Sequence, residues 1–119
     1  MHMPEEVSRA ADQLLDALRN TEAFVQYDEL RKTVLADEVN RRLLDRFARA
    51  QSALQLAAIA GHEPREEDAG EFERLSALLY DSPEITDYLL AQMKVQQLVA
   101  ATMEKLTREA GIQIEIPQA

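Results

Sequence analysis

The chain has 119 residues, a formal net charge of −9 at pH 7, and no cysteine or tryptophan. The lack of cysteine excludes disulfides, thiolate zinc sites and a cysteine-ligated iron–sulfur cluster from this chain, so no cofactor is expected. The negative charge disfavours broad binding to a phosphate backbone. With three glycines and four prolines, little interrupts a helix, and we expect one all-α domain over residues 1–119, helical over 5–111.

Two helices are predicted in the first third of the chain. The first begins near Pro4 and ends at about Arg19, because its apolar residues recur every three or four positions. These residues are Val7, Ala11, Leu14 and Leu18. Thr21 is a suitable N-cap for the second helix. The apolar stripe of that helix consists of Phe24, Tyr27, Leu30 and Val34.

The middle of the chain predicts a longer helix, a loop and a shorter helix. Asp37 is a suitable N-cap for a third helix over Glu38–Ala60, and Gly61 ends it. The apolar residues of this helix are spaced close to a heptad repeat. A loop is expected over Gly61–Asp68, and a fourth helix follows to about Tyr80.

The fifth predicted helix is the longest. Ser82 can cap it, Pro83 suits its first position, and nothing breaks the helix before Gly111. A helix over Pro83–Ala110 is about 40 Å long at about 1.5 Å per residue. A compact sphere of this mass is only about 35 Å across, so the spare length predicts a partner. The candidate oligomer interface is the apolar stripe Tyr88, Val95, Val99 and Leu106.

The helices predict an oligomeric bundle. We expect the long third and fifth helices to form an antiparallel core that the three shorter helices cover. Apolar surface beyond that cover predicts a homodimer or a higher oligomer. Residues 112–119 begin with alternating apolar and polar residues, which predicts an extended tail. That tail either lies on the helices or pairs with a second chain.

The order and spacing of these features resemble one protein family. The segments that carry the resemblance are Thr21–Tyr27, Leu35–Glu38, Leu43–Phe47, Leu75–Leu79 and Ser82–Leu89. In this order the chain resembles the YlbF/YmcA family of small all-helical bacterial regulators, with YheA-like proteins as near relatives. The ending Gly111-Ile112 favours the YlbF/YmcA group.

The resemblance implies a regulatory adaptor and not an enzyme. Members of the family act in complexes that tune the membrane-anchored endoribonuclease RNase Y, and they influence competence, sporulation and biofilm formation. The implied partners are a second copy, other family members or an RNase Y-type complex. The family has no catalytic residues to carry over. Some of its complexes are associated with iron–sulfur clusters. This chain departs from that pattern, because without cysteine it cannot supply thiolate ligands.

A row of arginines is the candidate partner surface. Arg42, Arg46 and Arg49 are spaced by four and three residues, so they share one face of the third helix. This face can dock an acidic protein or an RNA strand. The alternative is a solvated face, because Glu38–Arg42 and Asp45–Arg49 are favourable pairs four residues apart.

Two other functions remain as alternatives. One is an RNA-binding helical dimer that uses these arginines, which the net charge makes unlikely. The other is a small all-α enzyme of the chorismate mutase type, which needs convergent basic residues that the sequence does not offer. His2 and His62 lie far apart, so no metal site is expected. No signal peptide or apolar run of 18 residues is present, so we expect a cytoplasmic protein without a membrane span.

Overall fold

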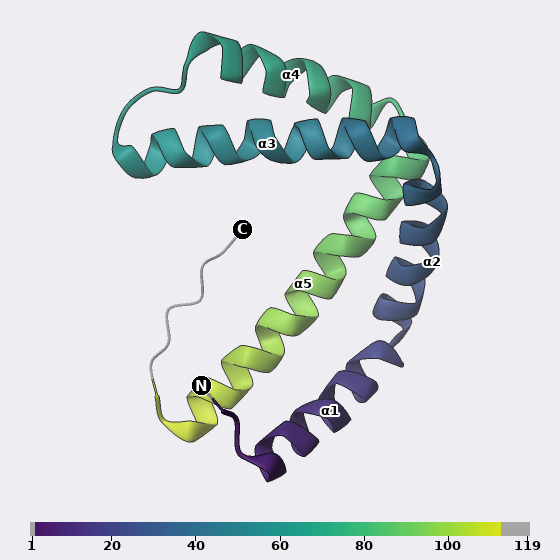
Figure 1. The fold of residues 1–119 in the computed structure, drawn as a ribbon, viewed down its shortest axis with the longest axis vertical. Coiled ribbons are helices and arrows are strands. Elements are labelled where there is room, and N and C mark those ends of the chain that lie inside the picture. The colour runs from purple at the N-terminus through teal and green to yellow at the C-terminus, as the bar shows by residue number, and fades with distance from the viewer. Residues whose placement is uncertain (1, 113–119) are drawn as a thin grey trace. The chain divides into compact units, whose positions relative to one another are not determined.

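The computed structural model describes residues 2–112 and shows five α-helices and no strand in that range (Figure 1). The helices are α1 (Glu5–Arg19), α2 (Glu22–Ala36), α3 (Glu38–Ala60), α4 (Glu66–Tyr80) and α5 (Pro83–Ala110). The prediction of an all-α chain with five helices is therefore confirmed. One boundary differs, because α4 begins inside the predicted loop Gly61–Asp68. The predicted tail, from residue 113 on, lies outside the described residues.

The helices form two compact units. In the described part, the first unit holds α1, the start of α2 up to Tyr27, and α5 from Leu90 onward. The second unit, residues 28–89, holds the rest of α2, all of α3 and α4, and the first turns of α5. Two helices thus run from one unit into the other. A single domain over residues 1–119 stays a prediction.

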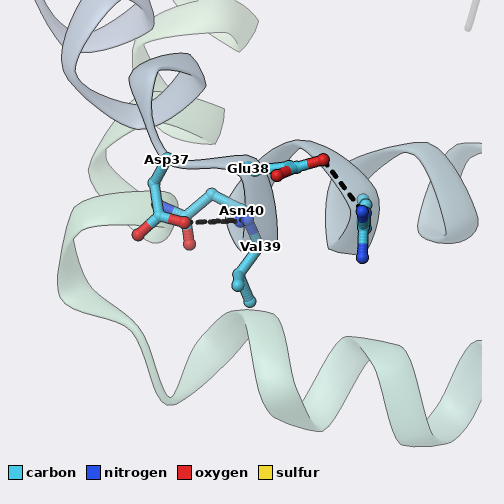
Figure 2. Close-up of polar contacts among 5 residues, drawn as sticks. Asp37, Glu38, Val39 and Asn40 are labelled. Carbon is cyan, nitrogen blue, oxygen red and sulfur yellow. Dashed lines mark hydrogen bonds and ion pairs between the residues drawn. The ribbon is translucent and has the colours of Figure 1, made fainter.

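The starts of α2, α3 and α5 are capped by short polar side chains. The carboxylate of Asp37 accepts hydrogen bonds from the backbone N–H groups of Val39 at 2.8 Å and Asn40 at 3.3 Å (Figure 2). The hydroxyl of Thr21 accepts from the N–H of Phe24 at 3.4 Å, and that of Ser82 accepts from the N–H of Ile85 at 3.3 Å. These bonds satisfy backbone donors that have no partner in the first turn of a helix. The three predicted N-caps are thereby confirmed.

Glycines end the two longest helices. Gly61 and Gly111 have φ angles of 77° and 72°, in the left-handed region that favours glycine. After α3, the N–H of Gly61 donates to the carbonyl of Ala58 and the N–H of His62 donates to that of Ala57. This pair of bonds is the Schellman arrangement, which satisfies the last carbonyls of the helix.

The second unit has an aliphatic core. Its most deeply buried side chains come from α2, α4 and α5, and all are at most 1% exposed: Val34, Leu75, Leu79 and Ile85. On α3 the small residues Ala50 and Ala57 are buried, which lets a neighbouring helix approach closely. The rings of Phe47 and Phe72 stack across α3 and α4, with centroids 5.3 Å apart.

The helix that lies along α3 is α4, and the two form an antiparallel hairpin (Figure 1). The prediction that α3 and α5 form an antiparallel core is therefore wrong for this chain. The physical reason is the short connection, residues 61–65, which brings α4 straight back onto the apolar face of α3. Phe47 and Phe72 then fill the seam that the prediction assigned to α5.

The first unit buries much less. None of the residues of α1 is buried, although its apolar residues form a clear stripe. On the part of α5 that belongs to this unit, Ala91 and Val95 are the buried residues in the described range. The apolar stripe of α1 therefore remains exposed. Helices in proteins are stabilised mainly by packing of their apolar face, and α1 lacks such packing within the described chain.

Replacing Leu75 with alanine should destabilise the chain by about 2–5 kcal/mol, because it empties a fully buried site in the second unit. The free energy of unfolding, measured by urea denaturation followed by circular dichroism, tests this. Leu78→Ala is the matched control, since Leu78 lies on the same helix but is exposed. An equal loss for both variants would contradict the assignment of Leu75 to the core.

Replacing Asp37 with alanine should cost about 1 kcal/mol, because the first turn of α3 loses its capping acceptor. Asp37→Asn keeps an acceptor oxygen and should retain most of that stability. Thermal denaturation of the three proteins at one pH measures the difference. If alanine and asparagine behave alike, the hydrogen bonds to Val39 and Asn40 do not stabilise the helix.

Candidate protein-interaction surfaces

The predicted arginine face exists, but each of its members has a carboxylate partner. Arg42 pairs with Glu38 at 2.8 Å, and Arg49 pairs with Asp45 at 3.1 Å, both within α3. Figure 2 shows the first of these pairs on the first two turns of the helix. All four side chains are well exposed, and pairs of this kind contribute at most about 1 kcal/mol. The face is therefore close to neutral.

Arg46 has a different partner. Its guanidinium donates to Glu71 of α4, and the same carboxylate accepts from Arg74 at 2.7 Å. The hydrogen bond from Arg46 is the main reason why the pKa of Glu71 lies below the usual glutamate value, and the charge of Arg46 and the contact with Arg74 add to it. Arg46 thus joins α3 to α4. A partner that docks on Arg46 has to compete with Glu71 for its guanidinium group.

A shallow, open pocket of about 210 Å³ lies beside the Glu71 carboxylate. It is lined by Arg46, Arg49, Ala50, Asp68 and Glu71. Two of its four ionised groups, Arg46 and Glu71, already bind each other. A ligand in this pocket has to compete with that contact.

The cations without an ion-pair partner lie elsewhere. In the part of the chain that the structure describes, five basic residues form no ion pair: Arg19, Arg31, Lys32, Arg41 and Lys94. Of these, Arg31, Lys32 and Arg41 belong to the second unit. The four- and three-residue spacing in the sequence singled out the paired arginines Arg42, Arg46 and Arg49 instead. Pairing four residues apart was visible in the sequence, but the contact between Arg46 and Glu71 joins residues 25 positions apart and left no local signal.

The predicted oligomer stripe of α5 divides into two parts. Tyr88 and Val95 are 7% and 9% exposed, so they belong to the buried residues of the chain itself. Val99 and Leu106 are 39% and 51% exposed, and Met103 lies between them on the same side of the helix. An interface on this stripe therefore begins after Val95.

The apolar stripe of α1 was predicted from the sequence, but it was not proposed as an interaction surface. On α1, the side chains of Val7, Leu14 and Leu15 are exposed although they share one stripe. The three- and four-residue spacing was visible in the sequence, but it is equally typical of a helix covered by its own chain. The exposure of these side chains in the folded chain distinguishes a stripe that is free to meet another protein from a stripe covered by its own chain.

No cluster of three or more His, Asp or Glu side chains in residues 2–112 is arranged to hold a metal ion. No described helix combines the length and the hydrophobicity needed to cross a bilayer.

Comparison with known sequences matches one family over most of the chain. The family described as control of competence regulator ComK, YlbF/YmcA, matches residues 7–109. Among curated proteins, the UPF0342 protein YheA of Bacillus subtilis is 29% identical over 86 residues, which is 72% of this chain and 74% of YheA. A UPF0342 protein of Halothermothrix orenii is 26% identical over 85 residues, 71% of this chain and 72% of that protein.

Solved structures share the fold. A protein of unknown function (DUF964) from Bacillus stearothermophilus matches with a TM-score of 0.70 and 18% identity, over 90% of this chain and 94% of that one. Bacillus subtilis RicA, solved in complex with RicF, appears in a second structure that matches with a TM-score of 0.62 and 15% identity. This match covers 92% of this chain and 96% of the other. At these identities the likeness establishes the fold alone.

Replacing Glu71 with glutamine should make stability less dependent on pH. Because its pKa is lowered in the folded state, the ionised Glu71 stabilises the fold fully above the ordinary glutamate pKa of about 4.3. This stabilisation is lost as the pH falls through the lowered pKa. Glu71→Gln should therefore be less stable than wild type at pH 7, and the two proteins should converge in acid.

Urea denaturation between pH 7 and pH 3 measures this convergence. Glu67→Gln is the control, because among the described residues Glu67, in the first turn of α4, forms an ion pair with the exposed Arg65 alone. If the free energies of unfolding of wild type and Glu71→Gln differ by the same amount at every pH, the charge of Glu71 does not stabilise the fold through Arg46 and Arg74.

Proposed function

The chain belongs to the YlbF/YmcA family, and we propose that it is a non-catalytic regulatory adaptor that acts by protein–protein contact. The family resemblance extends this proposal to RNase Y-dependent RNA processing, with competence, sporulation or biofilm formation as the regulated processes. The partners are then a second copy, another family member or an RNase Y-type complex.

The observation that carries the proposal is the match over residues 7–109 to a family of regulators. RicA, which shares the fold, was crystallised with the protein RicF. The exposed apolar stripes of α1 and α5 add support, because apolar surface of this kind is typical of sites where proteins meet.

RNA binding through α3 is the weaker alternative. Phosphates would have to displace Glu38, Glu71 and Asp45 from the three arginines. The net charge of −9 further opposes approach to a polyanion. A docked acidic protein faces the same competition, so the apolar stripes are the better candidates for the main partner site.

The adaptor proposal is tested by affinity capture of the tagged full-length protein from its native cells, with wild type and three variants in parallel. Leu106→Glu changes the α5 stripe, and Arg42→Glu with Arg46→Glu and Arg49→Glu changes the arginine face. We expect one set of proteins to be captured with wild type and lost at least tenfold with Leu106→Glu. The control Ile59→Glu alters a side chain that is 83% exposed in the second unit and should capture the same set.

Two results would overturn the proposal. One is capture of no protein above the level of an unrelated tagged control. The other is a salt-dependent shift of RNA by the purified protein that the three α3 substitutions abolish, which would support the RNA-binding alternative.

A further inference from the structure

The last turns of α5 carry an apolar stripe that the described part of the chain leaves exposed. Val99, Met103 and Leu106 are spaced by four and three residues, so they lie on one side of the helix, and all three are exposed. Towards the start of the helix, Val95 is buried within the chain. The uncovered stripe therefore lies next to the point where the helix ends, at Ala110.

The end of α5 holds the following residue beside this stripe. The N–H of Gly111 donates to the carbonyl of Arg108 at 3.2 Å, and the N–H of Ile112 donates to that of Thr107 at 3.0 Å. In this Schellman arrangement the residue after the glycine commonly makes an apolar contact with the helix residue roughly six positions earlier. Here these two positions hold Ile112 and Leu106. The chain thus leaves the helix at the exposed stripe.

The sequence that follows has the pattern of a segment with one apolar side. Ile112, Ile114 and Ile116 alternate with Gln113 and Glu115. In an extended segment every second side chain points to the same side, so the three isoleucines share one side and the polar residues share the other. Such a segment becomes stable when its apolar side is covered.

The two apolar rows agree in number and nearly in length. Residues 112–116 in extended conformation span about 13 Å, at a rise close to 3.3 Å per residue. The stripe of α5 from Leu106 to Val99 covers about 10 Å along the helix axis, at a rise of 1.5 Å per residue. Three isoleucines therefore have three apolar partners within reach.

We propose that residues 112–116 fold back antiparallel along the last turns of α5 and cover the exposed stripe. Ile114 then lies against Met103, and Ile116 lies against Val99. Because these residues follow the helix directly, their effective concentration at the stripe is roughly millimolar, so a weak contact suffices to hold them there. Of the two positions predicted for the tail, this is the one on the helices.

The covered stripe is also the best candidate for the partner site, so residues 112–116 form a strap that competes with the partner. A protein partner binds only those molecules in which the strap is displaced, and its apparent affinity falls by that fraction. This consequence rests on the proposed adaptor function, whereas the docking of the strap on α5 does not.

Disulfide trapping tests where the strap lies. The chain has no cysteine, so introduced cysteines can bond only with one another. Full-length protein with Met103→Cys and Ile114→Cys is oxidised mildly in dilute solution, and the products are identified by non-reducing gel electrophoresis and intact mass. We expect a disulfide within one chain.

The matched control carries Ala101→Cys with Ile114→Cys. Ala101 is exposed as well, but it lies two residues from Met103 and therefore on the far side of the helix. We expect this pair to form its disulfide at least tenfold more slowly. Equal rates for the two pairs would overturn the docking of the strap on this stripe, as would a product linked mainly between two chains.

Affinity capture from native cells tests the competition. Ile114→Glu with Ile116→Glu places two charges on the apolar side of the strap, and Gln113→Glu with Gln118→Glu adds the same charge outside that side. We expect the isoleucine variant to capture several-fold more of the same proteins than wild type, and the glutamine variant to capture as much as wild type. Equal or reduced capture by the isoleucine variant would overturn the competition.

Failure of the strap and failure of the adaptor function give different results. Capture of no protein by wild type or by either variant would contradict the adaptor and with it the competition, while the trapping rates still decide whether the strap docks on α5. Equal trapping rates together with capture that Leu106→Glu abolishes would overturn the strap and leave the adaptor in place.

Discussion

Burial of the aliphatic side chains of α4 is the constraint on which the second unit depends. Leu75 and Leu79 of α4 are 1% exposed, and Val34 of α2 and Ile85 of α5 are equally well buried. The stacked rings of Phe47 and Phe72 extend this core along the hairpin of α3 and α4. The Arg46–Glu71 contact joins the same two helices.

Local structure followed closely from the sequence. The bounds of α3 and α5 were predicted to the residue, because Asp37, Ser82, Gly61 and Gly111 mark them with capping chemistry that acts within four residues. The neighbour of α3 was predicted wrongly. An apolar stripe shows that a helix has a face to bury, but it does not identify the partner. A five-residue connection made α4 the nearest helix, and this effect of chain length outweighed the match between the two long stripes.

The candidate surfaces show the same limit. The three α3 arginines share a face as the spacing predicted, but their partners differ in kind. Arg42 and Arg49 have local partners that i,i+4 spacing predicts, while Arg46 binds a residue on another helix. The division of the α5 stripe after Val95 also had no signal in the sequence, since buried and exposed residues there are equally apolar. The tertiary structure decides which part of the α5 stripe is covered by the chain itself.

The continuity of α5 connects stability with binding. Its first turns belong to the core through Ile85 and Tyr88, and its last turns carry the exposed Val99 and Leu106. A single helix of 28 residues joins them, and no glycine or proline interrupts it after Pro83. The exposed stripe is therefore presented on a preformed helix, so a partner that binds it does not bear the entropy of ordering that segment. The last turns of α5 thereby offer an apolar binding face without a large core beneath it.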